Sequence, residues 1–208
     1  ADFDLDGKKD IFIANGIKRR SNDLDYINFI TYDSIQKIVN QKMSEKDLEL
    51  INLMPQIKAP NYLYANNGDS TFSNKSKEWG LDKISYSNGA AYADLDNDGD
   101  LDLVINNVDD EAFLYENKTI QKGKTDGNHF LKVKLWGKVG NRYGYGAKVF
   151  LYNKGKLQMQ ECMPTRGFES AVDYRLIFGL GTDKIIDSVK VVWPGGADQV
   201  LKNVKGSQ

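Results

Sequence analysis

The sequence is poor in the two side chains that most often carry nucleophilic and zinc chemistry. It contains one cysteine, Cys162, and one histidine, His129, among 208 residues. A single cysteine excludes an internal disulfide framework and leaves the redox compartment open. Cys162 is expected to be a small core residue, because nothing in the sequence links it to His129 as a catalytic partner. Zinc is disfavoured, since no histidine or cysteine lies near the acidic segments described below.

Long apolar runs and an excess of one charge are also missing. No segment approaches the roughly 20 apolar residues that span a membrane. The 28 basic and 29 acidic residues nearly balance, and the lysines are scattered, so no nucleic-acid-binding face is indicated. The sequence opens at Ala1 rather than at a methionine, which indicates a fragment, so the missing signal peptide does not argue against export.

The sequence is rich in residues that form strands and turns. It holds 11 tyrosines, 9 phenylalanines and 19 glycines, and 40% of its residues are hydrophobic. This composition favours a mainly β fold with a real core over a helical bundle.

Two acidic segments, residues 1–15 and 93–107, align without a gap at an offset of 92. A second block follows each of them, because residues 61–66 match residues 112–117. Internal similarity of this kind indicates repeated supersecondary units, and propeller repeats are about 40–50 residues long. The excess length is placed in residues 17–59, where the apolar spacing predicts an inserted helical hairpin.

The second helix of this insert is expected to begin at the capping box of residues 44–47 and to end before Pro55. Its apolar stripe would either pack on the neighbouring strands or form a lid or partner surface.

Each acidic segment contains a nine-residue loop, named loop one (residues 2–10) and loop two (residues 94–102). Both have glycine at position 6 and carboxylates at positions 1, 3, 5 and 9. Position 7, Lys8 or Asp100, would lend a backbone carbonyl. Crowded carboxylates repel one another, and calcium takes six to eight oxygen ligands, so the sequence predicts two Ca²⁺ sites. The carboxylates are Asp2, Asp4, Asp6 and Asp10 in loop one and Asp94, Asp96, Asp98 and Asp102 in loop two.

The loops do not follow the EF-hand pattern. An EF-hand needs a glutamate at position 12, which here is Ile13 or Ile105, and a helix afterwards. Strand-like runs follow instead, so each ion would hold a β-turn. Magnesium stays an alternative with stricter octahedral demands. Loop two has a predicted strand before it, residues 88–93, whereas loop one has none in this sequence.

A polar stretch over residues 118–128 predicts a linker. Alternating strands separated by Gly and Asn clusters follow and predict a small antiparallel β domain. We therefore divide the chain into residues 1–122, with the insert at 17–59, and residues 123–208. The expected strands of the second domain are 130–136, 147–152, 157–161, 174–178 and 188–193.

Both regions resemble known families. The two loops, together with residues 66–72 and 79–81, resemble the FG-GAP/VCBS repeat, a calcium-binding propeller blade shared with the integrin α-subunit head. The second domain is similar to the ASPIC/UnbV domain, and the order of the two is that of the bacterial cartilage-acidic-protein-like group. The residues that carry the second resemblance are 141–147, 166–168, 178–181 and 191–195.

The resemblance implies a secreted or surface-exposed, calcium-bound partial propeller of about two blades, and no established reaction. Propellers close with four to eight blades, so upstream blades of the same protein are expected to be missing here. Asp69-Ser70 also replaces the usual Asp-Gly of the family.

No catalytic motif emerges from the sequence. It lacks a Gly-x-Ser-x-Gly elbow and a His-Glu-x-x-His helix, and its obvious aspartates belong to the loops. Trp136 and Trp193 would stack on a sugar or fill a core corner, and Arg166 and Glu169 flank a turn that would hold a surface ion pair or a ligand.

The sequence therefore predicts a non-catalytic, calcium-binding module for binding or adhesion, with an unknown protein or glycan ligand and no nucleic acid or membrane span. It would be secreted, periplasmic or at the cell surface. The alternative is an accessory part of a polysaccharide-processing enzyme or uptake system.

Overall fold

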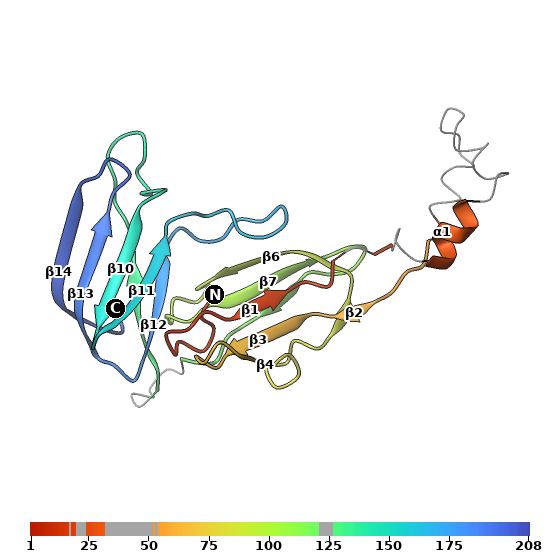
Figure 1. Ribbon diagram of the computed structural model, residues 1–208, viewed down its shortest axis with the longest axis horizontal. Coiled ribbons are helices and arrows are strands. Elements are labelled where there is room, and N and C mark those ends of the chain that lie inside the picture. Colours follow the sequence, from red (N-terminus) through yellow and green to blue (C-terminus); the bar gives the residue numbers. More distant parts are fainter. Residues whose placement is uncertain (17, 20–23, 32–51, 53, 121–126) are drawn as a thin grey trace.

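The computed structural model describes residues 1–16, 18–19, 24–31, 52, 54–120 and 127–208. These residues form a mainly β structure of several antiparallel sheets without a closed barrel among them (Figure 1). The predicted fold class is confirmed to this extent. Within the described residues, no helix is both long and apolar enough to cross a membrane.

The two predicted repeats form two similar three-stranded sheets. The first has the order β1-β3-β4 and the second the order β6-β7-β8. A short two-stranded sheet, β2 with β5, lies between them in the sequence. The strands are β1 (Ile11–Ile13), β2 (Ala59–Pro60), β3 (Tyr62–Asn66), β4 (Phe72–Asn74), β5 (Ile84–Ser85), β6 (Ser87–Ala93), β7 (Asp102–Asn107) and β8 (Phe113–Tyr115).

Strand pairing repeats in the same register in both sheets. In the first, Ile11 lies opposite Tyr64, and in the second, Leu103 lies opposite Tyr115. The alignment of the two acidic segments matches Ile11 with Leu103, and the alignment of the blocks that follow matches Tyr64 with Tyr115. Because a slip of one residue would turn every side chain to the other face, the shared register places equivalent side chains on equivalent faces of the two sheets. Their burial differs, since Leu103 is buried whereas Ile11 is exposed.

The segment 17–59 is only partly described. Helix α1 (Leu24–Ile30) lies where the first insert helix was expected, at the end of the molecule away from the C-terminal sheet (Figure 1). The second predicted helix falls almost wholly outside the described residues. The helical hairpin therefore stays a prediction.

The C-terminal region contains a four-stranded sheet, order β11-β10-β13-β14, and a two-stranded ribbon of β9 and β12. Five of its six strands correspond to predicted ones, and the last strand, β14, was not predicted. The strands are β9 (His129–Val133), β10 (Lys148–Asn153), β11 (Lys156–Glu161), β12 (Leu176–Gly181), β13 (Ile185–Val192) and β14 (Asp198–Lys205).

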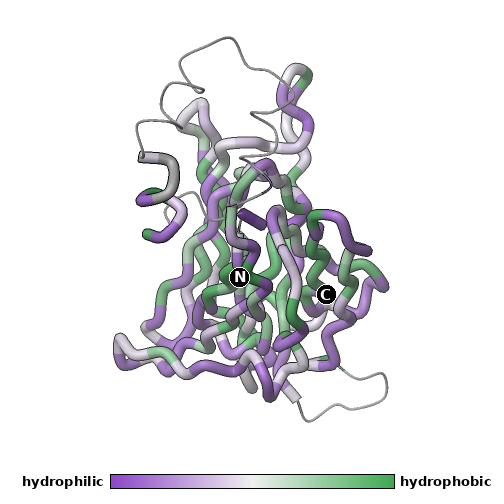
Figure 2. Tube along the Cα trace, turned by 90° about the vertical axis from the view of Figure 1, so that its right-hand side faces the viewer, coloured by the Kyte–Doolittle hydropathy of each residue, from purple (hydrophilic) through white to green (hydrophobic). Residues whose placement is uncertain are grey.

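Strand β12 connects the two regions, because its faces belong to different cores. Phe178 is fully buried in the C-terminal core, whereas Ile177 packs into the core of the repeats with Leu5 and Leu63. Side chains alternate across a strand, and a strand that is buried on both faces reads as a continuous apolar run. Figure 2 shows hydrophobic segments within the sheets and hydrophilic turns around them.

Candidate metal centre

Each acidic loop closes through backbone that requires a left-handed conformation at two positions. The glycines at position 6, Gly7 and Gly99, have φ of 90° and 108°. The residues at position 4, Leu5 and Asn97, have φ of 59° and 62°. Glycine adopts such angles at little cost, and asparagine tolerates them better than leucine does. The predicted turn geometry is therefore the same in both loops.

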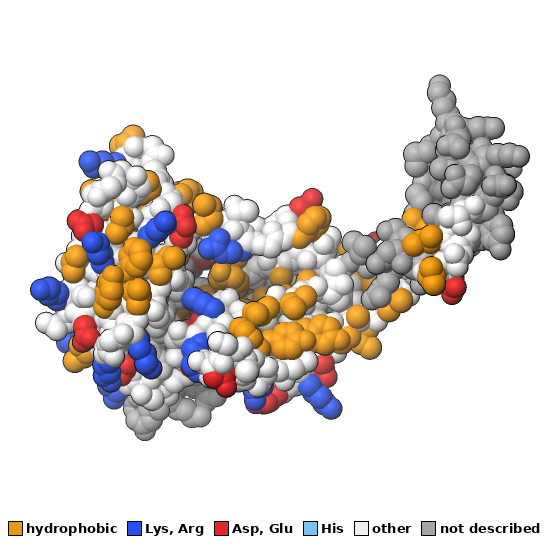
Figure 3. Space-filling model, viewed as in Figure 1, with side chains coloured by type: hydrophobic (Ala, Val, Ile, Leu, Met, Phe, Trp, Pro, Cys, Tyr) orange, Lys and Arg blue, Asp and Glu red, His pale blue; other side chains and the backbone are white. Residues whose placement is uncertain are grey.

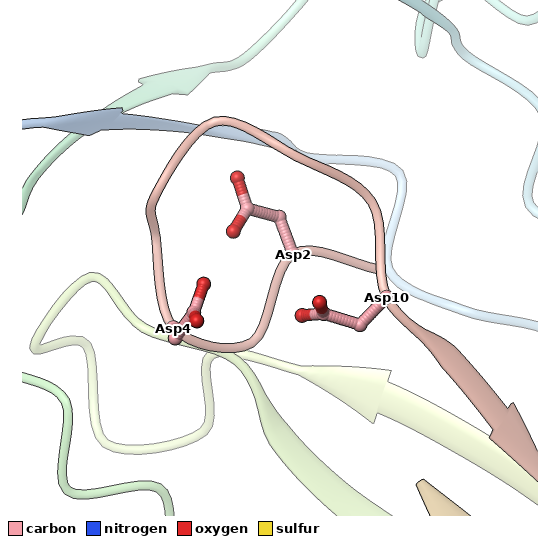
Figure 4. Close-up of side chains that lie close together, drawn as sticks. All are labelled: Asp2, Asp4 and Asp10. Atoms are coloured by element: carbon pink, nitrogen blue, oxygen red, sulfur yellow. The ribbon is translucent and has the colours of Figure 1, made fainter. Parts of the chain in front are cut away.

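Three carboxylates converge in each loop. Asp2, Asp4 and Asp10 in loop one each offer an oxygen within 4.8 Å of the others. Figure 4 shows these three side chains pointing into the ring that the loop forms. In loop two, the equivalent residues converge within the same limit. They are Asp94, Asp96 and Asp102.

The carboxylate at position 9 of loop one also organises the backbone. Asp10 accepts hydrogen bonds from the amides of Phe3 at 2.8 Å and Asn66 at 3.1 Å. The Asn66 side chain donates to the carbonyl of Lys9 at 3.1 Å and accepts from the amide of Gly68 at 2.9 Å. Asp10 and Asn66 therefore tie loop one to the end of β3.

Loop two repeats this arrangement. Asp102 accepts from the amides of Leu95 at 2.8 Å and Asn117 at 2.9 Å. The Asn117 side chain donates to the carbonyl of Leu101 at 3.1 Å and accepts from the amide of Thr119 at 2.9 Å. The two asparagines close the matching blocks at residues 61–66 and 112–117. That repetition was a usable sequence signal for their role, and it was missed.

In both loops, buried carboxylate oxygens have no hydrogen-bond partner among the described residues. Asp2 is 0% exposed and Asp94 is 2% exposed, and Oδ1 of each has no partner. Burial raises the pKa of Asp2 to about 7, with its loop neighbour Asp10 adding to the effect. Burying an unpaired carboxylate costs several kcal/mol unless a cation compensates it. An oxygen-only set of this kind fits a hard divalent cation such as calcium.

The carboxylates at position 5 lie outside both clusters. Asp6 accepts from the amide of Lys8 at 2.8 Å and from its ammonium group at 2.7 Å. Asp98 accepts from the amide of Asp100 at 3.1 Å. The backbone-carbonyl role of Lys8 and Asp100 stays a prediction.

Asp100 has a buried carboxylate that forms a hydrogen bond outside the loop, which its sequence position did not indicate. Its side chain is fully buried, and its Oδ2 accepts from the amide of Ile120 at 2.7 Å, while Oδ1 faces no donor. Burial is the first cause that raises its pKa to about 7, and the charge of Asp98 contributes. Asp100 therefore ties loop two to the chain that follows β8.

The β9–β12 ribbon of the C-terminal region covers both loops. The amide of Gly181 donates to the carbonyl of Leu5 at 2.8 Å, and Asn128 donates to the carbonyl of Asp4 at 2.6 Å. On loop two, the ammonium group of Lys132 forms an ion pair with Asp94. None of these contacts was predicted, because no sequence pattern links Asn128, Lys132 or Gly181 to the loops.

The ribbon approaches the loops so closely that it needs glycine. A Cβ atom on Gly179 would lie 2.3 Å from Oδ2 of Asp2 and 2.5 Å from the backbone of Leu5. A Cβ atom on Gly99 of loop two would lie 2.0 Å from the ring of Phe130. Real structures do not contain such contacts, so both glycines are required for this packing.

The remaining candidate residues lie apart from the loops. Cys162 is buried in the C-terminal core, as predicted, and His129 contacts the hydroxyl of Ser207 at 2.8 Å. Among the described residues, no carboxylate forms an ion pair with His129. Arg166 donates to the carbonyl of Thr165 at 3.0 Å.

Comparison with known families adds two matches. A model described as FG-GAP-like repeat matches residues 47–105, which include loop two, and a model described as ASPIC and UnbV matches residues 137–208. No curated protein matches the chain. Loop one lies outside both matches, so its assignment to the same kind of repeat depends on its alignment with loop two.

Proposed function

The chain belongs to the proteins that combine an FG-GAP-like repeat with an ASPIC and UnbV domain, and we propose that it is a calcium-binding, non-catalytic binding module of an extracytoplasmic protein. The ligand would be a protein or a glycan. The setting would be secreted, periplasmic or at the cell surface.

The unpartnered buried oxygens of Asp2 and Asp94 are the observation that carries the calcium proposal. In each loop the three converging carboxylates would hold the ion, and the ion would contact the buried oxygens that have no hydrogen-bond partner. Asp10 and Asp102 would link the ion to the ends of β3 and β8 through their backbone hydrogen bonds. Calcium would thereby stabilise the packing of each repeat.

Calcium should raise the melting temperature of the chain, and a chelator should lower it. A ligand bound only by the folded state adds about 2.7 kcal/mol at a hundredfold excess over its Kd. Thermal unfolding with calcium and with chelator measures this, and a double variant, Asp4→Asn with Asp96→Asn, serves as the control that should respond far less. Identical melting curves for the unmodified chain under both conditions would refute calcium binding.

Exposed apolar side chains on the first sheet support the proposal of further blades. Ile11 and Ile13 of β1 and Tyr62 of β3 are exposed, and Figure 3 shows hydrophobic side chains gathered over this region. A contiguous apolar face is typical of a surface that another element covers. We propose that a neighbouring blade of the same protein covers it.

The lack of catalysis is a proposal of its own. The converging carboxylates of the described residues already belong to the loops, and the Cys162 thiol is buried among core side chains. Burial raises the pKa of this thiol, which disfavours the nucleophilic thiolate. Screening against glycoside, ester, peptide and phosphate substrates should give no turnover. Turnover that is lost when a carboxylate outside both loops is replaced would contradict this proposal.

One observation favours the alternative role with polysaccharides. Trp136 is 71% exposed and lines a groove of about 580 Å³ with Trp193, whose indole N–H donates to Gln199 at 3.1 Å. Among the described residues, no carboxylate lines the groove, so binding of a sugar fits it better than hydrolysis. Affinity electrophoresis with a panel of polysaccharides tests this idea. Retardation that Trp136→Ala abolishes and Phe168→Ala preserves would support it.

A further inference from the structure

The C-terminal region places a positive charge inside loop two. Lys132 projects from β9, its side chain is only 19% exposed, and its ammonium group forms an ion pair with Oδ2 of Asp94. Asp94 is one of the three converging carboxylates, and its own side chain is almost completely buried. Lys132 therefore contacts Oδ2 of Asp94, and Oδ1 of the same carboxylate has no hydrogen-bond partner among the described residues.

A second cation from the same region supports this contact. Arg175 donates to the side chain of Asn97 at 3.1 Å and to the carbonyl of Asp94 at 3.4 Å. Its guanidinium is held by an ion pair with Asp173. Arg175 thus binds the backbone side of loop two, and Lys132 binds its carboxylate side.

Loop one receives no such charge from the C-terminal region. Its contacts there are the amide of Gly181 and the side-chain amide of Asn128, both of which donate to backbone carbonyls. Among the described residues beyond position 120, no lysine or arginine forms an ion pair with Asp2, Asp4 or Asp10. The two loops have the same carboxylate geometry and differ in the nearest cation: Lys132 forms an ion pair with Asp94, whereas the charge of Lys9 only opposes the rise in the pKa of Asp2.

We propose that Lys132 is a built-in counter-cation of loop two, which lowers the affinity of loop two for a divalent cation below that of loop one and is displaced when the cation binds. The proposal rests on the proposed calcium function. Two positive charges cannot share one carboxylate cluster at low cost, because like charges about 4 Å apart repel by several times RT even at an effective dielectric constant of about 20.

The competition also acts in the opposite direction. Coupling between two binding events is reciprocal, so a cation in loop two weakens the contact of Lys132 with Asp94 by the same factor. Occupancy of loop two would therefore loosen one contact between the repeats and the C-terminal region, whereas occupancy of loop one would not.

Calorimetric titration of the full chain with calcium tests the proposal. We expect a tight and a weak site in the unmodified chain, assigned by Asp4→Asn for loop one and Asp96→Asn for loop two. Lys132→Met should tighten the weak site at least about tenfold, because it removes a unit charge from the cluster. Lys134→Met removes an equal charge from an exposed position two residues away, and it should leave both sites unchanged.

Lys132→Gln provides a second variant of similar length, and melting curves in chelator verify that each variant folds. Two sites of equal affinity, or a weak site that neither Lys132 variant tightens, would overturn the role of Lys132 while leaving calcium binding intact. Absence of calcium binding by the unmodified chain would instead overturn the proposed function and this inference with it.

Discussion

Loop one and loop two have the same backbone and different surroundings. Both place three carboxylates within 4.8 Å, and both use the aspartate at position 9 to accept two backbone amides. Loop one then meets neutral backbone of β12, with Leu5 completely buried at a left-handed position. Loop two meets charged side chains, and Asn97 occupies the equivalent left-handed position at the surface.

The difference separates two contributions to a candidate ion site. The repeat supplies the geometry, because the aspartate at position 9 of each loop accepts two backbone amides of its own unit. The C-terminal region supplies the electrostatic environment, through Lys132 on one loop and uncharged groups on the other. Equal sequence motifs therefore do not imply equal affinity.

The largest expected effect is the loss of the backbone hydrogen bonds that the aspartate at position 9 accepts in each loop. Asp10→Ala and Asp102→Ala should each lower the free energy of unfolding by about 3 kcal/mol, because each leaves two buried or partly buried amides without an acceptor. The two variants should be equally destabilised in chelator, since the equivalent bonds have equivalent lengths. Urea unfolding followed by circular dichroism measures both.

Asp4→Ala is the matched control for loop one. It removes a carboxylate from the same cluster, but within the described part of the chain Asp4 accepts one hydrogen bond, from the amide of Asp6 at 3.2 Å. We expect a loss of about 1 kcal/mol in chelator. A loss equal to that of Asp10→Ala would mean that carboxylate repulsion, rather than backbone hydrogen bonding, dominates the loop.

The repeated geometry could be predicted from the sequence because it is local. Alternating carboxylates, the glycine at position 6 and the strand that follows lie within about a dozen residues, and two aligned copies reinforce one another. The internal strands of the C-terminal region were predicted for the same reason, since their alternation is a local pattern. The strand β14 (Asp198–Lys205) escaped because its side chains are largely exposed and its polar residues mask the alternation.

The contacts between the regions could not be predicted in this way. Lys132 and Arg175 lie at least 30 residues from the loop that they contact, and a lone lysine on a strand is usually a solvated side chain. The run of residues 176–181 did carry a signal, because an uninterrupted stretch of apolar residues and glycine is typical of a strand covered on both faces. Identifying the covering surface required the tertiary structure.

The second expected effect comes from a substitution that disrupts the packing of β12 against loop one and leaves loop two intact. Gly179→Ala should lower the free energy of unfolding by about 2 kcal/mol, because the new methyl group meets Asp2 and the backbone of Leu5. It should also weaken calcium binding at loop one and spare loop two. Gly195→Ala, where nothing lies within 4 Å, is the control and should cost less than about 0.5 kcal/mol. Equal losses in the two variants would show that the ribbon does not press on loop one.

The last expected effect is a dependence of stability on pH that each loop carries through a different residue. Burial raises the pKa of Asp2 in loop one and of Asp100 in loop two to about 7, well above the usual value near 4. A carboxyl group whose pKa is higher in the folded state takes up a proton on folding between these values. In chelator, stability should therefore fall as the pH rises from about 4 to 7, by at most about 1.4 kcal/mol per pH unit for each proton. Urea unfolding at several pH values measures the slope.

Single variants assign this slope to the two loops. Asp2→Asn should remove the contribution of loop one and Asp100→Asn that of loop two, because an amide cannot ionise. Calcium should reduce the fall in the unmodified chain, since the ion binds the ionised carboxylates and so opposes protonation. If both variants keep the full slope, the titrating groups lie elsewhere. If Asp2→Asn alone removes it, loop two is already neutralised by Lys132, and the contrast between the loops is sharper than their shared sequence suggests.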